Sequence, residues 1–188
     1  TTPWIEILSP LNNVGSSNVT YHVLANPTAL WRTGVVSIAS LNFTVAQAPA
    51  SCTFALATNN AAHGAGAGGG SVAVTTLVGC TWSVSNGVSW IHITSPLNNS
   101  NSATVIYTVD ANPTSLPRNA VVRIAGFDFT ITQSGAACTY DLDSFGISIN
   151  ASAQTNPVQV LTLVGCAWTV SNNVPWVTVL SPLTNTSG

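Results

Sequence analysis

The four cysteines are the residues whose chemistry is easiest to assign. Cys52 recurs as Cys138 and Cys80 as Cys166, both at an offset of 86 residues. Cys52 opens one apolar strand-like run and Cys80 closes the next; in an antiparallel hairpin these two points lie side by side. This geometry favours disulfides Cys52–Cys80 and Cys138–Cys166. Free buried thiols and a Cys80–Cys138 bridge remain as alternatives, because four cysteines allow three pairings.

Paired cysteines indicate a location outside the cytoplasm, so we expect an extracellular or cell-surface protein. A zinc site is poorly supported, since no CxxC motif and no nearby histidine accompanies any cysteine.

Acid–base chemistry finds little support in the remaining side chains. The histidines do not recur at the 86-residue offset, and the carboxylates form no repeated pair; these residues are His22, His63, His92, Glu6, Asp110, Asp128, Asp141, Asp143. Asp141 and Asp143 alternate on one strand face, where a weak cation site is conceivable but a solvated face is favoured. No nucleophile motif is present. We therefore predict no catalytic residue, no metal ligand, no cofactor and no enzymatic activity.

Two residue types suggest contact with sugars. N-x-S/T sequons, which are acceptors for glycosylation, begin at Asn18, Asn42, Asn98, Asn150, Asn185. They do not recur at the offset, and a chain this rich in asparagine, serine and threonine would contain several by chance. Trp31 is replaced by Pro117 one repeat later, so the fold does not require it. We predict an exposed sugar platform or an inter-domain contact at Trp31, and a core role for the recurring tryptophans such as Trp82 and Trp90.

Composition excludes several partners. Charged residues make up 4% of the 188-residue chain and the net charge is −2. Such a surface lacks the basic footprint of a nucleic-acid-binding protein, and its weak self-repulsion favours association. No apolar run approaches the roughly 20 residues of a membrane helix. The chain contains no methionine and no signal peptide, so we expect it to be a piece of a longer precursor.

An 86-residue repeat positions all of these residues. Trp4-Ile5 returns as Trp90-Ile91 and as Trp176-Val177. The other recurring pairs include Asn26 and Asn112, Arg32 and Arg118, Phe43 and Phe129, Gln47 and Gln133, Trp82 and Trp168. For Arg32 and Arg118 we predict a structural role, either bonding loop carbonyls or covering a tryptophan face.

Helical periodicity is missing, and short β-branched runs alternate with turn residues as in a β-sandwich. The seven strands expected in the central unit are Cys52–Thr58, Ser71–Leu77, Thr81–Ser85, Trp90–Thr94, Thr104–Val109, Ala120–Ala125 and Phe127–Gln133. Gly126 is expected in a tight turn, and Ala62–Gly70 in a mobile loop.

The repeat divides the chain into one complete domain and two partial ones. Residues 1–49 hold the C-terminal part of a domain, residues 50–136 a complete domain, and residues 137–188 the N-terminal part of another. Four residues separate Gln47 from Cys52, which favours a stiff rod. Two assemblies follow. Either the polypeptide continues, or residues 138–172 of one subunit are completed by residues 17–49 of the next. The continuous chain is favoured, because residues 1–16 and 173–188 are copies of one segment.

The run Cys80-Thr-Trp82, Trp90-Ile91, Ala111-Asn112, Arg118 and Phe129-Thr-Ile-Thr-Gln133 resembles the BACON domain. The resemblance implies an all-β protein of tandem immunoglobulin-like β-sandwiches, a bacterial surface or secreted location, and contact with carbohydrate. We expect a stalk, adhesin shaft or filament whose partners are copies of itself or further repeats; the alternative is an array of carbohydrate-binding modules.

Overall fold

The computed structural model describes residues 2–181 and 184–185, and within them every regular element is a β-strand. The strands are β1 (Ile5–Ile7), β2 (Tyr21–Val23), β3 (Arg32–Ile38), β4 (Leu41–Gln47), β5 (Phe54–Leu56), β6 (Asn60–His63), β7 (Gly68–Thr76), β8 (Thr81–Ser85), β9 (Ile91–Ile93), β10 (Asn98–Ser100), β11 (Ala103–Val109), β12 (Arg118–Ile124), β13 (Phe127–Gln133), β14 (Tyr140–Leu142), β15 (Val160–Thr162), β16 (Trp168–Thr169) and β17 (Thr184–Asn185). The all-β class predicted from the sequence is confirmed.

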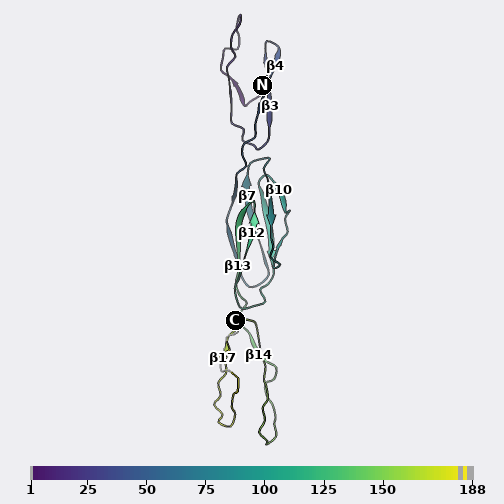
Figure 1. Cartoon of the computed structure of the whole chain (residues 1–188), viewed down its shortest axis with the longest axis vertical. Coiled ribbons are helices and arrows are strands. Elements are labelled where there is room, and N and C mark those ends of the chain that lie inside the picture. The colour runs from purple at the N-terminus through teal and green to yellow at the C-terminus, as the bar shows by residue number, and fades with distance from the viewer. Residues whose placement is uncertain (1, 182–183, 186–188) are drawn as a thin grey trace.

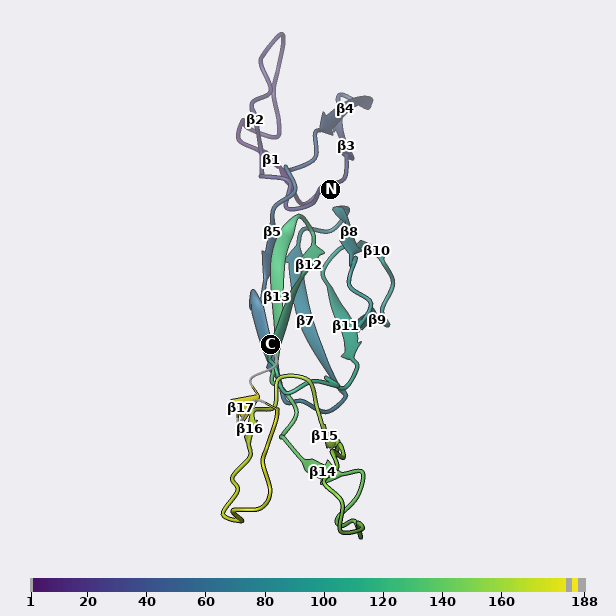
Figure 2. The ribbon, with the colours of Figure 1, turned by 60° about the horizontal axis from the view of Figure 1, so that its bottom comes forward.

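The strands fall into three sets that follow one another along the long axis of the molecule (Figures 1 and 2). We call β1–β4 the N-terminal group, β5–β13 the central group and β14–β17 the C-terminal group. Strand pairing is confined to each group. The predicted domain boundaries at residues 49 and 136 lie between these groups and remain a prediction.

The central group consists of two sheets around one core, as in a β-sandwich. One sheet has the order β10-β8-β12-β13-β6 and the other β5-β7-β11-β9. Alternate residues of each strand point inward, which is the pattern expected of sheets with one buried face. The core residues are Val72, Val74, Trp82, Val84, Ile91, Val105, Tyr107, Val109, Val122, Ile124, Phe129 and Ile131.

The flanking groups reproduce pairings of the central group at the 86-residue offset. The β3–β4 hairpin pairs Arg32 with Gln47, and the β12–β13 hairpin pairs Arg118 with Gln133. In the same way β1·β2 corresponds to β9·β11, β14·β15 to β5·β7, and β16·β17 to β8·β10. One residue pattern therefore gives one register wherever it occurs.

Tight turns support these hairpins. Ala125 and Gly126 both have positive φ, at 49° and 85°, which suits the two-residue turn between β12 and β13. Ala39 and Ser40 adopt the same conformation between β3 and β4, with φ of 48° and 66°. The predicted turn at Gly126 is confirmed.

The expected mobile loop over Ala62–Gly70 is wrong at both ends. Strand β6 ends at His63 and pairs in parallel with β13, while Gly68 begins β7 and pairs with Val109. Gly70 is needed there because a Cβ atom would collide with the hydroxyl of Tyr107, whose ring occupies that space. The glycines thus admit a large core side chain.

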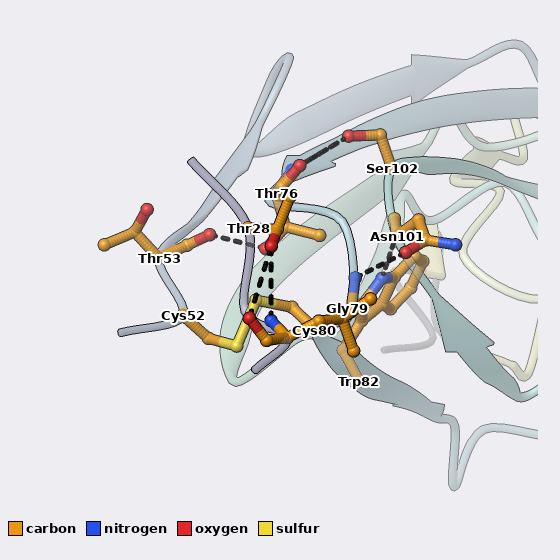
Figure 3. The surroundings of a disulfide bond; sticks show 10 residues. Thr28, Cys52, Thr53, Thr76, Gly79, Cys80, Trp82, Asn101 and Ser102 are labelled. Atoms are coloured by element: carbon orange, nitrogen blue, oxygen red, sulfur yellow. Dashed lines mark hydrogen bonds between the residues drawn. A yellow bond between two sulfur atoms is a disulfide. The ribbon is translucent and has the colours of Figure 1, made fainter. Parts of the chain in front are cut away.

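Both disulfides favoured by the sequence, Cys52–Cys80 and Cys138–Cys166, are present. Figure 3 shows Cys52–Cys80 at the end of the central group, with Thr28 of the N-terminal group beside it. Nearby, Asn101 accepts a hydrogen bond from the Gly79 amide at 2.7 Å through its side chain and one from Trp82 Nε1 at 2.9 Å through its carbonyl oxygen. The disulfide therefore lies within a bonded network.

We expect the double variant Cys52→Ala/Cys80→Ala to unfold more readily than the native chain. The bridge closes a 28-residue span. Removing it raises the conformational entropy of the unfolded chain, which lowers the free energy of unfolding by about 3–4 kcal/mol in the chain-entropy model. Thermal and urea unfolding of the full chain, followed by tryptophan fluorescence, measures the loss. An unchanged transition midpoint would show that the bonded network alone holds this end together.

Candidate functional site

The N-terminal and central groups are joined by a hydrogen bond and a close packing contact as well as by the chain. The loop at Ala29 and Leu30 lies on the turn at Val78 and Gly79, where the Ala29 amide donates to the Val78 carbonyl at 2.7 Å. Gly79 has φ of +93°, and a Cβ atom there would lie 2.7 Å from Cγ of Leu30. Glycine is therefore required at this point both for its backbone conformation and for the close approach of leucine.

The same contact recurs between the central and C-terminal groups. The Ser115 amide donates to the Val164 carbonyl at 3.0 Å, and the Ser115 hydroxyl donates to the same oxygen at 3.1 Å. Gly165 has φ of +89°, and a Cβ atom there would lie 2.7 Å from Cγ of Leu116. We call these two contacts the joints. Each residue of the second joint lies 86 positions after its counterpart in the first.

A buried asparagine shapes the loop that enters each joint. Asn112 donates to the carbonyls of Leu116 and Ser134, at 2.7 and 3.1 Å, and its side-chain oxygen accepts from the Thr114 amide. Asn26 makes the corresponding bonds to Leu30, Ala48 and Thr28 in the first joint. Because one amide side chain joins the loop to the connecting segment, the loop cannot move without breaking several bonds.

The connecting segment itself is bonded to the loop. The Ala50 amide donates to the Thr28 carbonyl at 2.8 Å, and the Ala136 amide donates to the Thr114 carbonyl at 2.7 Å. Two residues beyond each of these bonds the chain reaches a disulfide cysteine, Cys52 or Cys138. Little free backbone is left to act as a hinge.

The repeated arginines brace the same region, as predicted. Arg118 Nε donates to the Gln133 side chain at 2.8 Å, and its Nη2 donates to the carbonyls of Asp110 and Ala111. The guanidinium lies over the ring of Trp90 at 4.2 Å. Arg32 repeats these contacts with Gln47, Leu24, Ala25 and Trp4, its guanidinium lying 4.3 Å from the Trp4 ring. Both predicted structural roles are thus present at once.

Trp31 is 70% exposed and adjoins Leu30 of the first joint. The recurring Trp82 is buried and Trp90 packs partly against the core, which agrees with their predicted role. Trp176 is exposed in the C-terminal group. Of the sequon asparagines, Asn18, Asn42, Asn98 and Asn150 are exposed, and Asn185 lies in β17.

Each histidine has a polar partner that the sequence did not reveal, because the partners lie on paired or packed strands. His22 contacts Glu6 at 3.2 Å and His92 contacts Asp110 at 3.0 Å, both at the surface. His63 contacts the Tyr107 hydroxyl at 3.1 Å, and burial raises the pKa of that hydroxyl. Among the described residues no cluster of three or more potential metal ligands occurs.

The central group belongs to a class of all-β domains in which two sheets share one core. The family model described as "BACON: Putative binding domain, N-terminal" matches residues 81–134. The resemblance to the BACON domain predicted from the sequence is thereby confirmed over β8–β13.

One solved structure is similar at a low level: "Bacteroides ovatus GH5 xyloglucanase in complex with a XXXG heptasaccharide". It is 21% identical with a TM-score of 0.40, and the match covers 46% of this chain and 19% of that one. The chain thus spans about a fifth of the length of that enzyme. No curated protein matches the sequence. The described elements include no helix that is long and apolar enough to cross a membrane.

We expect the double variant Gly79→Val/Gly165→Val to bend at the joints. Valine strains a backbone at positive φ and displaces the leucine, so the flanking groups lose their packing contact with the central group. Small-angle scattering of the full chain would report a broader distribution of maximum dimensions. Gly87→Val is the matched control, because Gly87 has open space around its Cβ position and φ outside the left-handed region. An unchanged scattering curve for the double variant would mean that the joints do not set the shape.

Proposed function

We propose that this chain is a non-catalytic structural segment of an extracellular shaft or filament. It consists, in this proposal, of tandem immunoglobulin-like BACON sandwiches spanning residues 1–49, 50–136 and 137–188. The observation that carries the proposal is the second joint, which repeats the backbone hydrogen bond and the glycine–leucine contact of the first at the 86-residue offset. When the same joint recurs, successive units are related by the same rotation and translation, and a linear array results.

Chemistry outside the joints supports the same function. Two disulfides suit an oxidising extracellular environment. The near-absence of charge leaves little repulsion between neighbouring shafts.

Electron microscopy of the protein isolated from its source tests this function directly. The expected result is a thin continuous fibre or stalk with one axial repeat per unit. Isolated, monodisperse particles, with no fibre and no longer parent chain on a denaturing gel, would exclude it.

Carbohydrate binding is the second candidate, and the exposure of Trp31 favours it. A tryptophan with a free face can stack on a pyranose ring. We expect Trp31→Ala to abolish retardation of the chain in affinity gels containing a recognised polysaccharide. Trp176→Ala is the matched control, since that side chain is 79% exposed but stands where the repeat places a packed tryptophan. This candidate would be removed if the two variants were retarded equally. It would also be removed if the native chain were retarded by no polysaccharide.

We also propose that sugars are attached to exposed sequons such as Asn18 and Asn98. Peptide mass spectrometry of the source material should find glycan mass on these asparagines. Peptides that carry only the unmodified residue would refute the attachment.

A further inference from the structure

The two flanking groups expose side chains that their counterparts in the central group bury. Phe43 in β4 is 42% exposed, whereas its counterpart Phe129 is 1% exposed. Val158, just before β15, is 56% exposed, whereas its counterpart Val72 is 2% exposed. The apolar surface is therefore open in both flanking groups at positions that a complete sandwich covers.

The central group shows what covers each surface. Strands β9 and β11–β13 correspond to the N-terminal group, and β5, β7 and β8 correspond to the C-terminal group. Between these two sets the central group forms β7·β11 over seven residue pairs and β8·β12 over two. Strand β6, whose counterpart segment 146–149 forms no strand, pairs with β13 over four. The pairings missing from one flanking group are thus the pairings that the other flanking group can supply.

Strand lengths follow the same division. Strand β11 runs over Ala103–Val109, but its counterpart β2 is limited to Tyr21–Val23, the residues that pair with β1. Strand β7 runs over Gly68–Thr76, but β15 is limited to Val160–Thr162, the residues that pair with β14. The residues 17–20 and 154–159, which are not in strands, correspond to segments that pair with each other in the central group.

The duplicated segment is used differently at the two ends. In the N-terminal group Ile5–Ile7 forms β1, the counterpart of β9, whereas residues 12–14 form no strand. In the C-terminal group Thr184–Asn185 forms β17, the counterpart of β10, whereas residues 177–179 form no strand. The N-terminal group therefore supplies the counterpart of β9, and the C-terminal group supplies the counterpart of β10.

We propose that two copies of this chain join head to tail, the C-terminal group of one and the N-terminal group of the next forming a single sandwich. Residues 138–172 supply the counterparts of β5–β8, and residues 17–49 supply those of β11–β13. The register is that of the central group, so Val158 faces Val19 across the new β7·β11-type ladder. This inference rests on the proposed filament function and names the partner: a second copy of the same chain.

One substitution fixes a detail of the junction. Asn156 stands where the central group has Gly70, whose Cβ position is taken by the Tyr107 ring. The ring of Tyr21, the counterpart of Tyr107, must therefore turn aside when the two groups join. Phe43 and Val158 keep the residue types of their counterparts Phe129 and Val72, which makes them the better positions for a test.

Sedimentation velocity of the oxidised 188-residue chain over a wide concentration range tests the junction. We expect oligomers that lengthen with concentration. Phe43→Asp and Val158→Asp should each weaken association at least about a hundredfold, because each removes a core contact of the new sandwich. Mixing the two variants should give heterodimers and nothing longer, since Phe43→Asp retains a working C-terminal group and Val158→Asp a working N-terminal one. A mixture that stays monomeric would overturn the proposal.

Val35→Asp is the matched control, because Val35 and its counterpart Val121 are 47% and 46% exposed and no burial is expected. It should associate like the native chain. A native chain that stays monomeric, or a control that fails as the test variants do, would also overturn the proposed junction. The shaft function would survive that result if source filaments contain a parent chain much larger than 19.3 kDa, since a continuous polypeptide would then complete each sandwich. Source material without fibres would instead remove the function itself.

Discussion

The lack of free backbone between units is the constraint on which the rest of the structure depends. The connection after Gln47 is bonded to the preceding loop at Ala50 and covalently fixed at Cys52. Its disulfide partner Cys80 ends the turn that receives Leu30. The preceding unit is therefore held at two points of one small surface, and two points of contact restrict rotation far more than a single covalent link does.

This constraint explains why so few polar side chains are buried and why those few recur. Asn112 and Gln133 are among the buried polar residues, and Arg118 joins Gln133 to the carbonyls of the loop. A loop bent sharply enough to reach the next unit leaves its carbonyls without strand partners, and each one costs free energy unless it accepts a hydrogen bond. Arg118, Asn112 and Gln133 thus supply hydrogen bonds where the backbone cannot bond to itself.

The sequence predicts strands best where β-branched residues alternate, as in Thr81–Ser85 and Phe127–Gln133, whose predicted and observed bounds agree. It misses β6 and β10 because Asn60–His63 and Asn98–Ser100 are made of residue types with low strand propensity. These segments are strands because they pair with β13 and β8, and that pairing cannot be recognised from their own residues. The joints were also not predicted. Gly79 and Gly165 recur visibly, but their need for positive φ and for a leucine across a unit boundary exists only in three dimensions.

A repeat without insertions has a further physical consequence for assembly. In the proposed array the strand pairings shared by the three groups recur at one offset, so cutting it at any point leaves two pieces whose missing pairings are complementary. A continuous polypeptide and a chain of separate subunits then have the same core, the same joints and the same disulfides. They differ at the sheet edges, where residues 1–16 and 173–188 duplicate one segment. Since β1 is formed from one copy and β17 from the other, the duplication does not by itself exclude separate subunits. The two copies still compete for one place, the edge of the sheet beside β2. Ile5–Ile7 already pairs there, so the segment 177–179 of the other subunit would have to stay unpaired.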